Sequence, residues 1–223
     1  ENFYVNHFLR PQLESLGEGF TFVKPWRMEI FGWPISIGKC VNVLASADMK
    51  VRLSVWSDRE GEGRIIIGDN VLICPGVRMS SAMEIRIGDN CMLARGAYLT
   101  DSDWHDIYNR IMPCRRPAPI RVEENVWIGD GAIICKGVTI GQNSVIGAGA
   151  VVVDDVPRNT IAAGNPARVV KELDANEKIV TRADWFKDPE RLSRDIDYLE
   201  WNKHKHNTFL NWFTHLLFPA RGD

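Results

Sequence analysis

An aliphatic residue recurs every six positions along much of the chain, commonly followed by glycine and then by polar residues. The clearest run begins at Ile128, and the aliphatic position returns at Ile134, Ile140, Ile146 and Val152. This period matches neither an amphipathic helix, with about 3.6 residues per turn, nor a simply alternating strand, with about two. It predicts a triangular coil in which each flat side takes six residues and points its aliphatic side chain into a narrow core.

Three such sides make a coil of 18 residues, which is the spacing from Ile128 to Ile146. Glycine near the corners lets the backbone turn sharply, as at Gly129, Gly141 and Gly147. Stacked coils bury a continuous aliphatic column that no single coil could bury alone. The pattern therefore predicts an all-β solenoid built from parallel strands.

The repeat is interrupted twice. Ile67 and Ile87 are 20 residues apart, which indicates a short insertion near residues 80–84. Ile87 and Ile128 are 41 residues apart, which fits either two coils plus five residues or one coil plus 23. We favour one coil with a long loop, because residues 104–119 break the repeat. Long loops on compact repeat folds usually carry function.

The two ends of the chain lack the repeat. We expect an N-terminal helical or extended cap over residues 1–34, the repeat domain over 35–171 and a helical extension over 172–223. The last segment has apolar residues at helical spacing, at Phe209, Trp212, Phe213, Leu216 and Leu217. This face indicates either a helix packed on the protein itself or a neighbouring subunit, or a contact of residues 207–218 with a membrane surface.

Composition narrows the possible partners. The formal net charge of the 223 residues is −2, so nothing global predicts a nucleic-acid surface. No apolar run approaches the roughly 20 residues needed to cross a bilayer. The five cysteines, an odd number without a CxxC pair, predict neither a disulfide framework nor a zinc site. We expect a reduced, cytoplasmic protein that holds no metal, with membrane-peripheral contact as the alternative.

The six-residue rhythm and two further segments resemble the hexapeptide-repeat acyltransferases. The segments are Asn125-Val126-Trp127-Ile128-Gly129 and Gly164-Asn165-Pro166-Ala167-Arg168-Val169-Val170-Lys171. The nearest branch is the galactoside, maltose and xenobiotic acetyltransferase group, together with O-acetyltransferases of surface glycans. The resemblance covers residues 35–171 and implies a left-handed parallel β-helix. It also implies a homotrimer with acetyl-CoA in the groove between neighbouring subunits.

The family's catalytic histidine precedes an extruded loop, and His105 occupies that place. It is also the only histidine within the predicted coils. A near-neutral imidazole suits removal of a proton from the acceptor as it attacks the thioester. Asp103 and Asp106 flank His105 and either orient its ring, contact the acceptor or are solvated. Arg110 belongs to a basic loop, with Arg115 and Arg116, that suits an anionic acceptor or is simply solvated.

The resemblance also assigns residues to the cosubstrate. Asp130 and Ala148 would present backbone groups near the pantetheine arm, and Trp127 would shape the groove unless it only packs on the coil. Arg168 and Lys171 stand where the family places cations against the nucleotide phosphates. Asp130 departs from the family, in which a small hydroxyl residue is common at that position.

The sequence thus predicts an acetyl-CoA-dependent O-acetyltransferase acting on a sugar or glycan precursor, with direct transfer and His105 as the general base. Alternatives are an N-acetyltransferase of an amino-sugar nucleotide and a non-catalytic β-helix scaffold. A γ-class carbonic anhydrase shares the fold, but it needs three histidines around zinc, and the coils supply one. A nucleophilic cysteine such as Cys114 is disfavoured because no partnered base stands at identifiable spacing.

Overall fold

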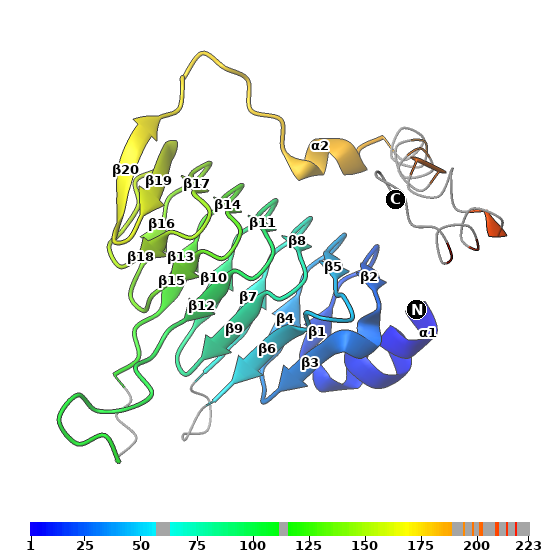
Figure 1. Cartoon of the computed structure of the whole chain (residues 1–223), viewed down its shortest axis with the longest axis horizontal. Helices are drawn as coiled ribbons and strands as arrows, with labels where there is room; N and C mark the ends of the chain where they lie inside the picture. The colour runs from blue at the N-terminus through cyan, green and yellow to red at the C-terminus, as the bar shows by residue number, and fades with distance from the viewer. Residues whose placement is uncertain are drawn as a thin grey trace. The chain divides into compact units, whose positions relative to one another are not determined.

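A computed structural model of the chain describes residues 1–56, 63–111 and 116–188. Beyond these it describes only residues 194, 198, 201, 202, 208, 209, 213 and 217. The chain divides into two compact units, Glu1–Arg182 and Ala183–Asp223. The first unit holds the coils (Figure 1).

Three parallel sheets make up the coils, and successive strands pass from the first sheet to the second and then the third. Sheet A contains β1 (Ser15–Leu16), β4 (Ile35–Ile37), β7 (Ile65–Ile67), β10 (Ile85–Ile87), β13 (Ile120–Val122) and β16 (Thr139–Ile140). Sheet B contains β2 (Thr21–Val23), β5 (Asn42–Leu44), β8 (Leu72–Ile73), β11 (Met92–Leu93), β14 (Trp127–Ile128), β17 (Val145–Ile146), β19 (Thr160–Gly164) and β20 (Ala167–Glu172). Sheet C contains β3 (Met28–Phe31), β6 (Val51–Val55), β9 (Arg78–Ser81), β12 (Tyr98–Thr100), β15 (Ile133–Ile134) and β18 (Val151–Val152). From β1 to β18 each strand thus pairs with the third strand along the chain, which is the arrangement of a hexapeptide-repeat β-helix.

The recurring aliphatic side chains form the core in stacked rows. On sheet A, Ile85 pairs with Ile65 on one side and Ile120 on the other, and all three are fully buried. Sheets B and C hold equivalent rows, such as Leu93 beside Ile73 and Ile128. Each residue therefore packs on its counterparts one coil away, as stacked repeats require.

Asparagine occupies the corner between sheets A and B in five consecutive coils. These residues have left-handed backbone conformations, with φ of 57–62°, at Asn70, Asn90, Asn125, Asn143 and Asn159. Asparagine tolerates this conformation better than most residues. The Asn143 amide donates to Asn159 Oδ1 at 2.8 Å and accepts from Asn125 Nδ2 at 3.0 Å, so the corner residues also link coil to coil.

The strand register locates both interruptions. Sheet A pairs Ile67 with Ile87, and the two extra residues lie in the turn between β9 and β10, where the short insertion was predicted. Ile87 then pairs with Val122, 35 residues later, so one coil carries an added excursion between β12 and β13. The prediction of one coil with a long loop is confirmed.

The first coil begins inside the segment that we expected only to cap the domain. Residues 2–12 are helical, as α1 (Asn2–Tyr4), η1 (Val5–Leu9) and η2 (Arg10–Gln12). Strands β1, β2 and β3 follow and pair with β4, β5 and β6. A short helical turn, η3 (Pro25–Arg27), lies between β2 and β3. Val5 and Leu9 are buried, so the helical residues cover the open end of the core.

The C-terminal end of the coils is closed by β20, which pairs antiparallel with β19. The chain continues to α2 (Arg182–Phe186), where Arg182 Nε donates to the Asn70 carbonyl oxygen at 2.6 Å and the guanidinium also binds Asn42 Oδ1. Most of the predicted extension, including most of residues 207–218, lies outside the described residues. Among the helices that are described, none is both long and apolar enough to span a bilayer.

Glycine at the corners is required by the close approach of neighbouring coils, which yields a first prediction. A Cβ on Gly88 would lie 2.7 Å from the Glu123 carbonyl carbon, whereas a Cβ on Gly131 would meet nothing within 4 Å. We expect Gly88→Ala to lower the free energy of unfolding by about 1–3 kcal/mol through overpacking. Gly131→Ala should cost only about 1 kcal/mol, for its left-handed φ of 65°.

Urea unfolding followed by circular dichroism, at one fixed protein concentration, measures both variants. An equal or smaller loss for Gly88→Ala would contradict the account of the corner.

Candidate active site

The long excursion leaves the coils at the corner between sheets C and A, and its first residue is anchored in the core. Asp101 is fully buried, and its carboxylate accepts hydrogen bonds from Ser81 Oγ at 2.7 Å and from the amides of Ala82 and Met83 at 2.6 and 2.9 Å. The Ala118 amide donates to the Asp101 carbonyl oxygen at 2.9 Å. The two ends of the loop are therefore joined at its base.

Lys136, from the same corner of the next coil, holds the neck of the loop. Its ammonium is ion-paired with the Asp103 carboxylate and donates to the Arg116 carbonyl oxygen at 3.0 Å. One residue thus contacts both arms of the loop. Asp103, predicted to orient the histidine or contact the acceptor, is engaged by Lys136.

His105 lies on the exposed part of the loop, two residues beyond this clamp. Among the described residues none forms a hydrogen bond with its ring. The Asp106 carboxylate accepts hydrogen bonds from the amides of Tyr108 and Asn109 at 2.8 and 2.9 Å, which shapes the turn after the histidine. Arg110 follows and is exposed. The imidazole is therefore accessible to an acceptor, while the residues around it are held.

Two cysteine thiols are poor nucleophiles: Cys135 near this corner and Cys91 at the corner between sheets A and B. Burial raises the pKa of the Cys135 thiol, and the nearby Asp103 carboxylate raises it further. Burial also raises the pKa of Cys91 to about 12. Because the thiolate is the reactive form, both remain protonated near neutral pH. Cys114, with Arg115, lies outside the described residues.

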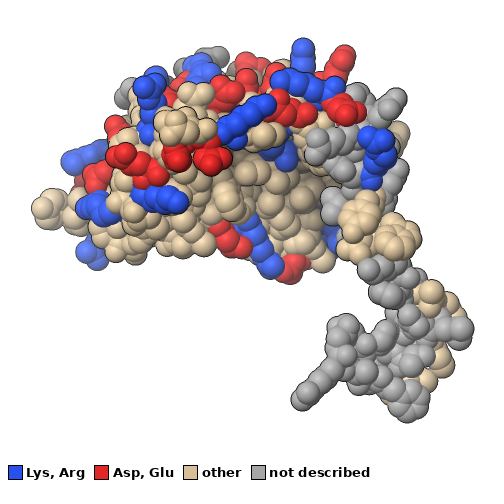
Figure 2. Space-filling view, turned by 90° about the horizontal axis from the view of Figure 1, so that it is seen from above, with Lys and Arg blue, Asp and Glu red and all other residues tan. Residues whose placement is uncertain are grey.

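The predicted groove residues lie on the outer face of sheet B. Trp127, Val145, Ile161 and Lys171 form one row across strands β14, β17, β19 and β20. Trp127 is half exposed, and Lys171 is exposed at the end of the row. Figure 2 looks down on the upper side of Figure 1, where sheet B lies, and shows a broad area of uncharged residues beside a margin of charged ones.

Asp130 and Ala148 stack on each other at the corner between sheets B and C. The Gly149 amide donates to the Asp130 carbonyl oxygen at 2.7 Å, and both residues are exposed. A Cβ on Gly131 or Gly149 would meet no atom within 4 Å. The backbone of these two coils is therefore open to a ligand.

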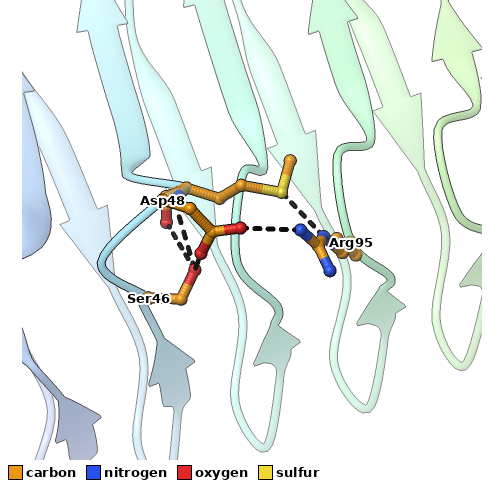
Figure 3. Close-up of polar contacts among 4 residues, drawn as sticks. Ser46, Asp48 and Arg95 are labelled. Carbon is orange, nitrogen blue, oxygen red and sulfur yellow. Dashed lines mark hydrogen bonds and ion pairs between the residues drawn. The ribbon is translucent and has the colours of Figure 1, made fainter.

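The same corner is covered two coils earlier. Figure 3 shows Asp48 and Arg95 reaching toward each other there, and Arg95 donates to Asp48 Oδ2 at 2.9 Å and to Met49 Sδ at 2.7 Å. Ser46 Oγ donates to Asp48 Oδ1 at 2.6 Å, and this hydrogen bond holds the Asp48 pKa below its usual range, with Arg95 adding to the effect. The Met49 methyl covers Gly76, so the open part of the corner ends at this cluster.

Arg168 connects the end of sheet B with the corner that carries the loop. It is exposed and pairs with Asp154 at 3.0 Å, at the corner between sheets C and A in the last coil. An exposed pair of this kind is worth about 0–1 kcal/mol, so the guanidinium is readily available to an anionic ligand. Lys171 has no ion-pair partner among the described residues.

The predicted residues therefore fall into two groups on one chain. His105, Asp103, Asp106 and Arg110 belong to the corner between sheets C and A. Trp127 and Lys171 belong to sheet B, and Asp130 and Ala148 to its corner with sheet C, away from the corner that carries the loop. In the part of the chain that the structure describes, no group of three histidine, cysteine or acidic residues could hold a metal ion.

Sequence reasoning missed Asp101, Lys136 and the Asp48–Arg95 cluster. Asp101 carried a usable signal, because a carboxylate stands two residues after the interior Leu99, at the point where the rhythm stops. No pattern in the sequence signals Lys136 or Met49, because their partners lie 20 or more residues away along the chain.

Two family models match the chain. One, described as bacterial transferase hexapeptide (six repeats), matches residues 119–154, and the other, hexapeptide repeat of succinyl-transferase, matches residues 64–101. The galactoside O-acetyltransferase of Lactococcus lactis is 30% identical over 169 residues, which cover 76% of this chain and 68% of the relative. The galactoside O-acetyltransferase of Escherichia coli is 41% identical over 116 residues, covering 51% and 57%.

The chain spans about half the length of the curated relatives that it matches at 38–45% identity, 44–60% of each. Among solved structures, a mutant of AntD, an N-acyltransferase from Bacillus cereus, superposes with a TM-score of 0.62 at 19% identity. That match covers 76% of this chain and 89% of the other. At this identity the match supports the fold alone.

The clamp at the loop neck yields a second prediction. Lys136→Met keeps the aliphatic stem but removes the ammonium from Asp103 and the Arg116 carbonyl, so we expect the loop to open more often. Because an exposed ion pair contributes about 1 kcal/mol at most, trypsin cleavage after Arg110 should quicken by about fivefold, with little loss of global stability.

Limited proteolysis read by mass spectrometry measures this rate. Lys187→Met, which removes an exposed pair with Asp184, is the matched control and should leave the rate unchanged. Equal rates for both variants would mean that Lys136 does not hold the loop.

Proposed function

We propose acetyl transfer from acetyl-CoA to a sugar hydroxyl as the reaction of this chain, because it belongs to the hexapeptide-repeat acyltransferase family. Its identity to the galactoside O-acetyltransferase of Lactococcus lactis, over most of both chains, favours an oxygen acceptor. The observation that carries the proposal is the exposed ring of His105 on a loop whose base and neck are both fastened. A cytoplasmic location, where acetyl-CoA is formed, and the family's left-handed coil are part of the proposal.

His105 acts as the general base. A ring nitrogen takes the proton of the acceptor hydroxyl as that oxygen attacks the thioester carbonyl, and the same proton then passes to the departing thiolate of CoA. An imidazole suits both steps because one ring nitrogen can first accept the proton and then donate it. Asp106 contributes by holding the turn that presents the ring. Direct transfer is favoured because burial keeps the nearby Cys135 protonated.

The outer face of sheet B suits the cosubstrate. Gly129, Gly147 and Ala163 form a row of small residues, and the space beside Gly131 and Gly149 leaves the backbone accessible to the pantetheine arm. Trp127 borders this row, and Lys171 and Arg168 offer cations for the nucleotide phosphates. The Asp48–Arg95 cluster limits the groove at its other end.

A site of this kind needs two copies of the chain. His105 and the Trp127 row lie on different sides of one coil, so they can serve one reaction only when a neighbouring copy supplies the second group. A homotrimer, which the family resemblance implies, provides three equivalent sites by cyclic symmetry.

Loss of the general base is the third prediction. We expect His105→Gln to lower kcat by about 10²–10⁴-fold, because an amide cannot take the acceptor proton, while acetyl-CoA binding is retained. CoA release against a panel of sugars and amino sugars, with calorimetric titration of acetyl-CoA, measures both quantities.

His7→Gln, in the N-terminal helical residues, is the matched control and should keep full activity. Transfer to amino sugars alone would replace the O-acetyltransferase proposal by an N-acetyltransferase. If neither the wild type nor the variants bind acetyl-CoA, the proposed transferase activity is contradicted.

The shared site yields a fourth prediction. His105→Gln chains and Trp127→Ala/Lys171→Glu chains should each be nearly inactive at low acetyl-CoA concentration. Mixed assemblies obtained by co-expression and purification on two tags should regain about a third of wild-type activity, because one of the three sites in a mixed trimer then combines an intact histidine with an intact groove.

Sedimentation of the mixed assemblies establishes that three chains are present. If mixing restores no activity, both halves of the site come from one chain.

A further inference from the structure

Three aromatic side chains, called here the aromatic ladder, follow the corner between sheets C and A: Phe31, Trp56 and Trp104. The ring centroids of Phe31 and Trp56 are 4.3 Å apart, and those of Trp56 and Trp104 are 6.4 Å apart in an edge-to-face arrangement. Phe31 is 53% exposed and Trp56 46% exposed. The ladder ends at Trp104, the residue before His105.

A row of hydroxyl groups accompanies the ladder on the outer face of sheet C. The register pairs Phe31 with Ser54, Ser54 with Ser80, and Ser80 with Thr100. Their neighbours Leu53, Met79 and Leu99 are fully buried, so the hydroxyl row faces outward. Trp104 Nε1 donates to Thr100 Oγ1 at 3.1 Å, which fixes the last ring beside the row.

The next row on the same face supplies hydrogen-bond donors. It runs from Glu29 through Arg52 and Arg78 to Tyr98. Glu29 engages Arg52 and Lys50, whereas Arg78 lies over the Tyr98 ring at 4.2 Å and has no carboxylate partner among the described residues. The Arg78 guanidinium is therefore stacked in place with its N–H donors available.

We propose that this face binds a chain of about three linked sugars, whose end reaches His105. The inference rests on the proposed function, since it names the length and nature of the acceptor. Sugars present apolar C–H faces and hydroxyl edges, which match the exposed rings on one side and the hydroxyl and guanidinium groups on the other. The ring centroids of Phe31 and Trp104 lie no more than about 11 Å apart, roughly the length of two pyranose rings, and a third sugar then reaches His105 beyond Trp104.

A second copy of this chain is the other candidate occupant. The core of a protein interface excludes charge and buries its rings against apolar neighbours. Here the rings stand beside hydroxyl groups and beside Arg78, which has no carboxylate partner in the described part of the chain, and they lead directly to His105. These neighbours favour a sugar chain.

Binding of malto- and chito-oligosaccharides of one to six sugars, followed calorimetrically without acetyl-CoA, tests the proposal. We expect affinity to rise with length up to about three sugars. Trp56→Ala should weaken binding of the trisaccharide by about tenfold, the loss of one stacking contact. In transfer assays the preference for trisaccharide over monosaccharide, as a ratio of kcat/KM, should fall similarly.

Trp26→Ala is the matched control, because Trp26 is 52% exposed and packs edge-on against Tyr4, away from the ladder. Equal effects of the two substitutions, affinity independent of length, or no binding in either series would overturn the proposal. A changed sedimentation coefficient for Trp56→Ala would assign the ladder to a subunit contact and also overturn it.

The two proposals fail separately. Binding that depends on sugar-chain length, without acetyl transfer, would support the proposed glycan-binding face and contradict the proposed transferase activity. Acetyl transfer to single sugars, without dependence on chain length, would support the proposed transferase activity and contradict the proposed glycan-binding face.

Discussion

The distance between neighbouring coils, which is the spacing of two paired strands, determines which residue can occupy each position. Neighbouring coils lie about 4.8 Å apart, so side chains inside must stack on their own counterparts and corners must turn without clashing. A Cβ at Gly68 would lie within 3.0 Å of the backbone of the next coil at Gly88 and Asp89. Asparagine two positions later accepts the left-handed conformation, and in the later coils Asn143 also donates a hydrogen bond to Asn159 along the stack. Extra residues can therefore leave the coil only at a corner, and they must leave outward.

The candidate site lies where the chain leaves the regular coil. The excursion after β12 keeps the stack intact because the buried Asp101 carboxylate replaces the hydrogen bonds of a regular corner and because Ala118 rejoins the chain at the same point. Lys136 then fastens both arms at the next coil. The chemistry proposed for His105 thus depends on a rigid base that the core supplies, while the proposed groove depends on open glycine backbone elsewhere on the coil. Both requirements come from the same repeat.

The six-residue period predicted the coils and both interruptions, because each depends on local spacing. The assignment of His105 came from the family resemblance and stays a prediction. Ile67 and Ile87 alone locate the short insertion to a few residues. The first coil was missed although Leu16, Phe22 and Met28 keep the six-residue spacing, because Phe22 and Met28 are not followed by the glycine that marks later repeats. The partners of Asp103 and Met49 were missed because stacking places residues from different coils side by side, at sequence separations that no local pattern encodes. The roles of Trp127, Asp130, Ala148, Arg168 and Lys171 stay predictions, although the register brings most of them to one face.

The joined base of the loop has an evolutionary consequence. Because Asp101 and Ala118 meet through a backbone hydrogen bond, everything between them can lengthen, shorten or change composition without altering the path of the coils. The loop can therefore be replaced as a unit, because the entropic cost of closing it grows only slowly with its length. Under the proposed function, a lineage that carries this scaffold can thus acquire new acceptors through a few substitutions in the loop, while the groove proposed for the acyl donor remains unchanged.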